Sequence, residues 1–254
     1  MTAILLAAGR GERAGGGVPK QFLSLAGRPM LAHSLLAFEA APAVDSVVVV
    51  LPPRRPSYAE RAISSPKIWA AVSGGETRQA SLTSGLAALP EDTSVVMVHD
   101  AARPLLSSEL VGRVLEALER GGADGVVCAI PLEDAIKEVS EQHGIARSAP
   151  REGLWRAQTP QAFRRDCLED ALARAEADGF VAADCSELAT RAGHRVTVVE
   201  GDPWNLKVTR PEDLALCETI LAVRAASVGD PGALARSGRV GIGFDVHGFD
   251  ETRR

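Results

Sequence analysis

Residues 3–21 read AILLAAGRGERAGGGVPKQ and join a short apolar run to a glycine-rich loop that ends at Lys20 and Gln21. The apolar run at 3–7 has the length and the two apolar faces of a buried β-strand. A glycine-rich loop after such a strand exposes backbone N–H groups that can bind a phosphate. Arg13 and Lys20 add positive charge to the loop. The stretch therefore predicts an α/β fold whose first strand leads into a phosphate-binding loop.

The pattern of the first strand repeats along the N-terminal half of the chain. Short apolar runs at 46–51, 69–73, 95–99 and 125–130 alternate with segments of helical pattern at 30–40, 57–64, 77–88 and 107–120. Strands that are apolar on both faces are typical of parallel sheets covered by helices on each side. Alternating strands and helices favour right-handed crossovers. We expect an open, mostly parallel, doubly wound sheet that binds its ligand at the carboxyl ends of the strands.

The pattern changes after Pro131. Two short strand-like pieces at 134–139 and 145–148 flank a turn at 142–144, which predicts a hairpin that projects from the sheet as a β-arm. Such a hairpin can be a plain surface feature or can join two subunits. Beyond it the sequence predicts two helices, a strand and a last helix, at 164–177, 184–192, 195–200 and 212–224.

The domain boundaries follow from composition. Residues 1–224 carry the strand and helix patterns, and residues 225–237 mix Ala, Gly, Ser and Pro as linkers do. Residues 238–254 start a new apolar pattern that is too short to fold alone. We therefore expect one α/β domain, a linker and the start of a second domain.

Composition limits the functions that this domain can have. The 28 Lys and Arg against 33 Asp and Glu give the 254 residues a net charge of −5, which argues against a general nucleic-acid binder. The 4 cysteines form no Cys-x-x-Cys pair and suit buried thiols in a reducing compartment. No apolar run approaches the roughly 18 residues of a membrane span, and the first run lacks the basic start of a signal peptide. The sequence predicts a cytoplasmic protein with neither nucleic acid nor membrane as a partner.

Two other nucleotide-binding loops fit residues 9–21 poorly. Gly9-x-Gly11-x-x-Ala14 matches a loose dinucleotide fingerprint, but no helix begins inside the loop and the second strand ends without an acid. A Walker loop needs Gly-Lys-Ser or Gly-Lys-Thr, whereas Lys20 stands between Pro and Gln. A flexible surface turn is the remaining alternative. We favour a ligand-binding loop, because the loop after the first strand of an open sheet faces the ligand.

Asp100 follows the apolar run at 95–99 and is well placed to bind Mg²⁺ on a nucleotide phosphate. Its alternative role is a helix cap, with Arg103 as an ordinary ion-pair partner. Lys20 and Lys207 also stand out, because lysine is rare in this arginine-rich chain. These residues predict an anionic, phosphorylated ligand.

Five groups of residues together resemble the 2-C-methyl-D-erythritol 4-phosphate cytidylyltransferase family. In chain order they are Leu6-Ala7-Ala8-Gly9 with Arg13 and Pro19-Lys20-Gln21, Gly74-Gly75 with Arg78 and Ser81, His99-Asp100-Ala101-Ala102-Arg103-Pro104, Gln158-Thr159-Pro160-Gln161, and Lys207-Val208-Thr209-Arg210-Pro211-Glu212-Asp213. The glycine-rich loop alone would indicate only a nucleotidyltransferase, whereas the third and fifth groups are far more specific. The resemblance covers about residues 1–224.

The resemblance implies a Rossmann-like nucleotidyltransferase fold and a defined reaction. CMP passes from CTP to 2-C-methyl-D-erythritol 4-phosphate and pyrophosphate leaves, which is a step of the non-mevalonate isoprenoid pathway. The resemblance also implies Mg²⁺ as cofactor and a homodimer joined by the arm at about 134–160.

Roles for single residues are implied in the same way. The catalytic residues would be Arg13 and Lys20, which hold the triphosphate and stabilise the transition state, and Lys207. The CTP site would comprise Ala7, Ala8, Gly9, Gly75, Ser81 and Asp100, of which Asp100 also serves Mg²⁺. The acceptor site would comprise Arg103, Lys207 and Arg151, the last reached across the dimer.

Position 135 departs from the family pattern, because Ala135 stands where the family often has Thr after Asp. The missing hydroxyl leaves open a different acceptor, such as ribitol 5-phosphate. A non-catalytic nucleotide sensor is a third alternative, which the intact cationic residues and Asp100 disfavour. Cys185, after Asp184, stands where an acid is common, and we treat this departure as neutral.

Residues 238–247, GRVGIGFDVH, resemble the start of a 2-C-methyl-D-erythritol 2,4-cyclodiphosphate synthase. In a strand Asp245 and His247 lie on one face and could share a divalent metal such as Zn²⁺. Two ligands alone predict no tight metal site, and a chance Asp-x-His pair is the alternative. The resemblance implies the front part of a fused bifunctional enzyme whose second domain is incomplete here.

Overall fold

A seven-stranded sheet forms the centre of the domain, with the strand order β11-β7-β10-β6-β1-β4-β5. The computed structural model describes residues 1–9, 18–53, 59 and 62–229. Its sheet strands are β1 (Thr2–Leu6), β4 (Ser46–Leu51), β5 (Ile68–Ser73), β6 (Val95–Asp100), β7 (Gly125–Pro131), β10 (Trp155–Arg164) and β11 (Val196–Glu200). Neighbouring strands pair in parallel except where β10 meets β6 and β7. The predicted mostly parallel sheet is confirmed.

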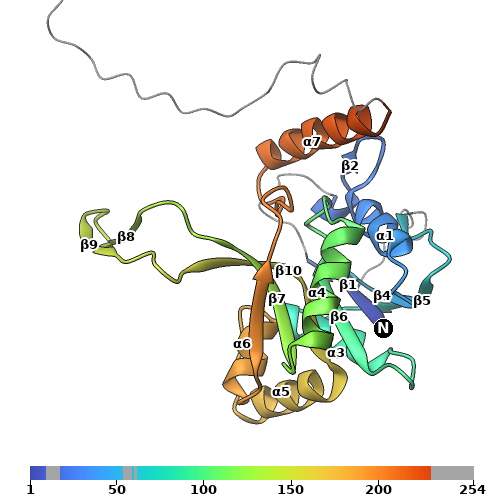
Figure 1. Cartoon of the computed structure of the whole chain (residues 1–254), viewed down its shortest axis with the longest axis horizontal. Coiled ribbons are helices and arrows are strands. Elements are labelled where there is room, and N and C mark those ends of the chain that lie inside the picture. Colours follow the sequence, from blue (N-terminus) through green and yellow to red (C-terminus); the bar gives the residue numbers. More distant parts are fainter. Residues whose placement is uncertain (10–17, 54–58, 60–61, 230–254) are drawn as a thin grey trace, which may run out of the picture.

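Helices cover both faces of this sheet, as Figure 1 shows. One apolar cluster joins Leu5 to α1 (Met30–Ala40) and α4 (Ser108–Arg120), and the opposite cluster joins Ile4 to α3 (Arg78–Ala87), α5 (Arg165–Ala177) and α6 (Cys185–Arg191). Leu5 and Ile4 are neighbours in β1 and therefore face opposite sides of the sheet. Both are wholly buried, which is why the strand is apolar on both faces.

The helix starts agree with the predictions to within one residue. Three of the predicted helices begin with an N-cap residue whose side chain accepts a hydrogen bond from a backbone N–H of the first turn. These residues are Thr77, Ser107 and Asp184. Of the helix predicted at 57–64, residues 57, 58, 60 and 61 lie outside the described residues. Residues 59 and 62 are helical, whereas 63 and 64 are not. All four cysteines are buried and free of disulfides, as predicted.

β10 is the strand of the central sheet that the sequence did not predict, and it lies between β7 and β6. It runs antiparallel to both neighbours, and its register with β7 shifts between Ala157 and Gln161. Gln158 and Thr159 fall within this shift and are buried. Polar residues and a proline break the apolar pattern that marks the other strands, and an irregular stretch of ladder tolerates them.

The predicted arm is present and projects away from the sheet (Figure 1). It consists of β8 (Ile136–Val139) and β9 (Ile145–Ala149), which pair with each other as a separate two-stranded sheet. Val139 and Ile145 are 60% and 67% exposed, so the arm presents apolar side chains to solvent.

Short elements and a long last helix cover the end of the sheet near its ligand edge. A 3-10 turn (Lys20–Phe22) leads into the small strands β2 (Ser24–Leu25) and β3 (Arg28–Pro29). α7 (Pro211–Gly229) packs Cys217 and Ile220 against Leu25, Met30 and Val208. The helix continues through residues 225–229, so the first five residues predicted as linker are helical. No helix in the described part of the chain is long and apolar enough to cross a membrane.

Candidate active site

A pocket of about 700 Å³ opens at the carboxyl ends of β1, β4 and β6. It gathers residues that are far apart in the sequence. They are Leu6 to Gly9, Lys20, Gln21, Pro52, Pro53, Gly75 to Arg78, Ser81, Asp100 to Ala102, and Lys207. Most of the residues that the sequence singled out for CTP therefore line one cavity, at the edge of the sheet where a ligand is expected.

Hydrogen bonds from two side chains hold the backbone where the glycine-rich segment begins and ends. Gln21 donates through Nε2 to the carbonyl oxygens of Ala7 at 2.6 Å and Gly9 at 2.9 Å. The neighbouring Lys20 donates through Nζ to the carbonyl oxygen of Val208 at 2.8 Å. Sequence reasoning gave Gln21 no role, although it stands next to the lysine in the motif. Arg13 lies outside the described residues.

The turn before α3 forms another wall of the pocket. A Cβ atom on Gly74 would lie 2.4 Å from Ala8 Cβ and 2.7 Å from Ser81 Oγ, so only glycine fits between Ala8 and helix α3 without displacing them. The Ser81 hydroxyl donates to the Thr77 carbonyl at 2.9 Å and accepts the Gly75 N–H at 3.2 Å. Ser81 thus shapes the wall that Gly75 presents to a ligand.

Asp100 ends β6 between two cations. Lys207 Nζ lies 2.7 Å from Oδ2, and Arg78 approaches Oδ1 at 3.4 Å. The Asp100 side chain is only 13% exposed. Burial by itself raises the pKa of Asp100, but Arg78 and Lys207 lower it by more, so its pKa lies well below the usual range. The pocket therefore holds a permanent carboxylate.

His99 is wholly buried, and its ring bonds to atoms of its own chain. Its Nε2 bonds the carbonyl oxygen of Arg103 at 3.1 Å, and a carbonyl can only accept, so Nε2 carries the proton. Nδ1 then accepts the Thr159 hydroxyl at 3.0 Å, and Thr159 Oγ1 accepts the N–H of Asp100 at 3.1 Å. Burial lowers the pKa of His99 to about 4, which keeps the ring neutral at pH 7. This chain of bonds fixes the backbone that carries Asp100.

Arg103 joins three segments and does not line the pocket. Its guanidinium donates to the carbonyl oxygens of Asn205 at 2.8 Å and Ala157 at 3.3 Å. It therefore ties the end of β6 to β10 and to the segment before Lys207. The bonds described for its guanidinium go to backbone carbonyls rather than to the carboxylate of Asp100.

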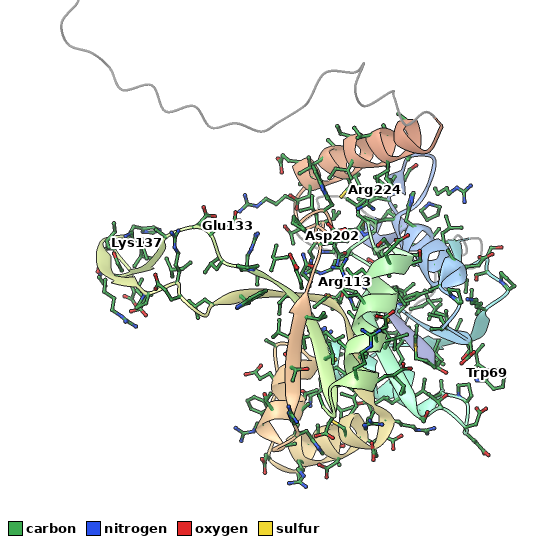
Figure 2. The ribbon with its side chains drawn as sticks, in the orientation of Figure 1. Trp69, Arg113, Glu133, Lys137, Asp202 and Arg224 are labelled. Atoms are coloured by element: carbon green, nitrogen blue, oxygen red, sulfur yellow. The ribbon has the colours of Figure 1, made fainter. Side chains whose placement is uncertain are left out.

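Arg151 and Ala135 lie on the arm, apart from the pocket of their own chain. Arg151 donates through Nη1 to the carbonyl oxygen of Glu133, and Figure 2 places Glu133 on the projecting arm, between the sheet and Lys137. Neither Arg151 nor Ala135 is among the residues that line the cavity. Asp245 and His247 fall outside the described residues.

The carboxylate of Asp100 fits Mg²⁺, which prefers hard oxygen ligands and commonly takes one or two carboxylates together with substrate phosphates. Within the described residues no group of three or more His, Cys, Asp or Glu side chains could hold a metal ion. A metal at Asp100 would therefore take its other ligands from phosphates and water.

The comparisons with known proteins agree with this geometry. The family model described as IspD, 2-C-methyl-D-erythritol 4-phosphate cytidylyltransferase, matches residues 1–223. A protein of that name from Ralstonia nicotianae is 42% identical over 238 residues, which are 90% of this chain and 94% of the relative. The crystal structure of the Thermus thermophilus cytidylyltransferase has a TM-score of 0.71 and 36% identity, and the match covers 87% of this chain and 98% of that one.

Some relatives are longer than this chain. The bifunctional enzyme IspD/IspF of Desulforudis audaxviator is 40% identical over 99% of this chain and 61% of its own length. The family model and the Ralstonia relative cover most of the chain, and the Thermus structure shares the fold described above. The chain belongs to the 2-C-methyl-D-erythritol 4-phosphate cytidylyltransferase family.

Proposed function

We propose that this chain transfers CMP from CTP to 2-C-methyl-D-erythritol 4-phosphate and releases pyrophosphate. The observation that carries the proposal is the convergence of Lys20, Asp100 and Lys207 on one pocket, which Gly9 also lines. Lys207 bonds Asp100, and Lys20 bonds the carbonyl oxygen of the next residue, Val208. Two lysines from distant parts of the sequence thus line the pocket that holds the Asp100 carboxylate.

Small residues line the side of the pocket that would hold the nucleotide. The cytosine and ribose would lie against the small residues Ala7, Ala8, Gly9, Gly75 and Ser81. The triphosphate would lie at Lys20 and Arg13, and Asp100 would hold Mg²⁺, which neutralises phosphate charge when bound. Arg103, whose guanidinium is directed to the backbone, would act on the acceptor mainly by fixing the segment before Lys207.

The reaction needs positioning and charge stabilisation more than proton transfer. A phosphate monoester has its second pKa near 6, so the acceptor is already anionic at neutral pH. One of its phosphate oxygens attacks the α-phosphorus of CTP, the bond to the bridging oxygen breaks, and pyrophosphate leaves with the electron pair. Lys207 orients the acceptor phosphate while Lys20 and Arg13 stabilise charge on the phosphates.

The arm is the proposed dimer contact, with Arg151 reaching the acceptor site of the partner subunit. Support comes from the exposed apolar residues Val139, Ile145, Leu154 and Trp155 and from the distance of Arg151 from its own pocket, since it bonds Glu133 on the arm. Mixing Arg151→Ala with Lys20→Ala protein tests this arrangement, because a mixed dimer would contain one intact site. Recovery of about a quarter of wild-type activity is expected. No recovery, with subunit exchange verified, would contradict it.

In the proposed domain division, residues 1–224 form the transferase and residues 238–254 begin a cyclodiphosphate synthase. The connection between them, 225–237, starts with the last five residues of α7. The match of the bifunctional relative across 99% of this chain supports it. Asp245 and His247 would belong to the metal site of that second domain. Equilibrium dialysis with Zn²⁺ is expected to leave no stoichiometric metal on these 254 residues, whereas tight binding would point to further ligands.

Pyrophosphate release from CTP and Mg²⁺ tests the main proposal, with methylerythritol 4-phosphate and ribitol 5-phosphate compared in parallel. Turnover with the methylerythritol acceptor alone is the expected result. Turnover with ribitol 5-phosphate alone would show that ribitol 5-phosphate is the acceptor. No turnover with either compound would favour a nucleotide sensor. Ala135→Thr is the matched variant, because it adds the hydroxyl that is missing at position 135. It should lower KM only for the true acceptor.

A further inference from the structure

Arg78 is a half-buried cation that the proposed reaction does not use, although it contacts the Asp100 carboxylate in the pocket. It approaches Asp100 with both Nε and Nη2 at 3.4 Å from Oδ1. Lys207 contacts the other oxygen, Oδ2. The two oxygens of Asp100 are therefore divided between two cations, and each cation has its own oxygen.

The two cations differ in how firmly the fold holds them. The Lys207 side chain is 44% exposed, whereas that of Arg78 is 27% exposed and its backbone begins helix α3. Lys207 also has a second task in the proposed reaction, because its ammonium must bind the acceptor phosphate. A lysine ammonium that turns to that phosphate gives up part of its contact with Asp100, whereas nothing on the acceptor side competes for the Oδ1 contact.

Contacts behind the guanidinium fix the orientation of Arg78. Nη1 donates to the sulfur of Cys185 at 3.4 Å, and Cys185 is wholly buried at the first turn of α6. Asp184, the N-cap of that helix, adds a negative charge nearby and is held in turn by Gln161 at 2.8 Å. The planar guanidinium thus spans from α6 to the end of β6, which a point charge cannot do.

We propose that Arg78 is the positioning residue for Asp100. It keeps Oδ1 in place while Oδ2 exchanges Lys207 for the cation that accompanies the nucleotide, and the Cys185 thiol sets the plane of the guanidinium. The inference rests on the proposed function, since it assigns Asp100 to the metal-bound nucleotide. It makes Arg78 a determinant of nucleotide binding rather than of acceptor binding.

Calorimetric titration of the protein with CTP and Mg²⁺ in the absence of acceptor tests this proposal without turnover. Removing a residue that orients a metal ligand typically weakens binding by about 10–100-fold, and Arg78→Gln should fall in that range. Arg78→Lys should recover only part of the loss. In steady-state assays Arg78→Gln should raise KM for CTP while KM for the acceptor changes little. Arg120→Gln, which removes a 78% exposed arginine on α4, is the control for charge.

The contribution of Cys185 is tested by a double-mutant cycle. Cys185→Ala should weaken binding of CTP with Mg²⁺ in the wild type and have no further effect in Arg78→Gln, whereas Cys185→Ser should retain an acceptor for Nη1. Folded fraction and Tm are measured for every variant. Lower Tm with unchanged nucleotide affinity would show that Arg78 is only structural and would overturn the proposal. Failure of the wild type to turn over any acceptor would overturn the proposed function and leave the binding test of Arg78 intact.

Discussion

The ammonium nitrogen of Lys207 lies 2.7 Å from Oδ2 of Asp100, across a sequence separation of 107 residues. This ion pair closes the pocket between the end of β6 and the segment that precedes α7. Lys207, which is proposed to bind the acceptor phosphate, therefore contacts Asp100, which is proposed to bind the metal of the nucleotide. The two halves of the substrate site are coupled through one short contact.

Lys207→Met should lower kcat/KM for the acceptor by about 10²–10³, because it removes a preorganised cation from the reacting phosphates. CTP binding should weaken far less, since Arg78 still contacts Asp100. Steady-state kinetics with each substrate varied in turn provides the measurement. A larger loss in CTP affinity than in acceptor affinity would show that Lys207 belongs to the nucleotide site.

Lys20→Ala should reduce the rate by about 10²–10³ with little change in Tm. Lys67→Ala is a matched control, because its ammonium also donates to backbone carbonyls, those of Phe38 and Ala41, at a place outside the pocket. Single-turnover CMP transfer and thermal melts of both variants are the measurements. A near-wild-type rate for Lys20→Ala would remove it from the catalytic residues.

Asp213→Ala should destabilise the protein by about 1 kcal/mol and raise KM for the acceptor. The Asp213 carboxylate accepts the N–H groups of Thr209 at 2.7 Å and Arg210 at 2.9 Å, and so holds the turn between Lys207 and α7. Partial burial raises the pKa of Asp213, but these bonds lower it by more, so its folded pKa is depressed.

Because the folded pKa of Asp213 is depressed, its carboxylate stabilises the fold fully at pH values above the unfolded pKa of 3.8. This stabilisation is lost as the pH falls through the folded pKa. Urea unfolding at pH 7 and below pH 4 should therefore show a stability gap between wild type and Asp213→Asn that narrows in acid. A gap independent of pH would show that the charge of Asp213 contributes nothing.

Gly74→Ala should cost about 1–3 kcal/mol and weaken CTP binding, because the new methyl group must displace Ala8 or Ser81 from the pocket wall. Gly112→Ala is the opposite case. Gly112 lies inside α4, and beyond its chain neighbours and the adjoining helix backbone no atom lies within 4 Å of the place that a methyl group would take. Alanine should therefore stabilise the helix by about 0.5–1 kcal/mol. Equal effects of the two substitutions would mean that the packing around Gly74 relaxes freely.

The sequence predicted the parallel strands because each one is a short run of apolar residues, and their period and length determine that structure locally. β10 escaped prediction because Gln158, Thr159 and Pro160 are stabilised by tertiary partners: Asp202, His99 and the irregular register with β7. No local pattern encodes those partners.

The candidate site shows the same division between local and long-range information. Lys20, Asp100 and Lys207 could be selected from their motifs, yet the contact of Lys207 with Asp100 depends on the complete path of the chain. Gln21 and Arg78 stood inside recognisable motifs without a role, because their partners are backbone carbonyls of the phosphate loop and side chains of α6 and β6. A motif identifies which residues matter, and the fold decides what each one contacts.

The arm begins and ends on paired strands, since Pro131 of β7 faces Trp155 of β10 and Leu132 donates its N–H to the carbonyl of Leu154 at 3.0 Å. In topological terms the arm is the distal end of one long β-hairpin whose proximal end is built into the core. Its length can therefore change in pairs of residues, through insertions or deletions at the tip, without altering the connection between β7 and β10. The reach of the arm and the architecture of the pocket are separable properties on which evolution or protein engineering can act independently.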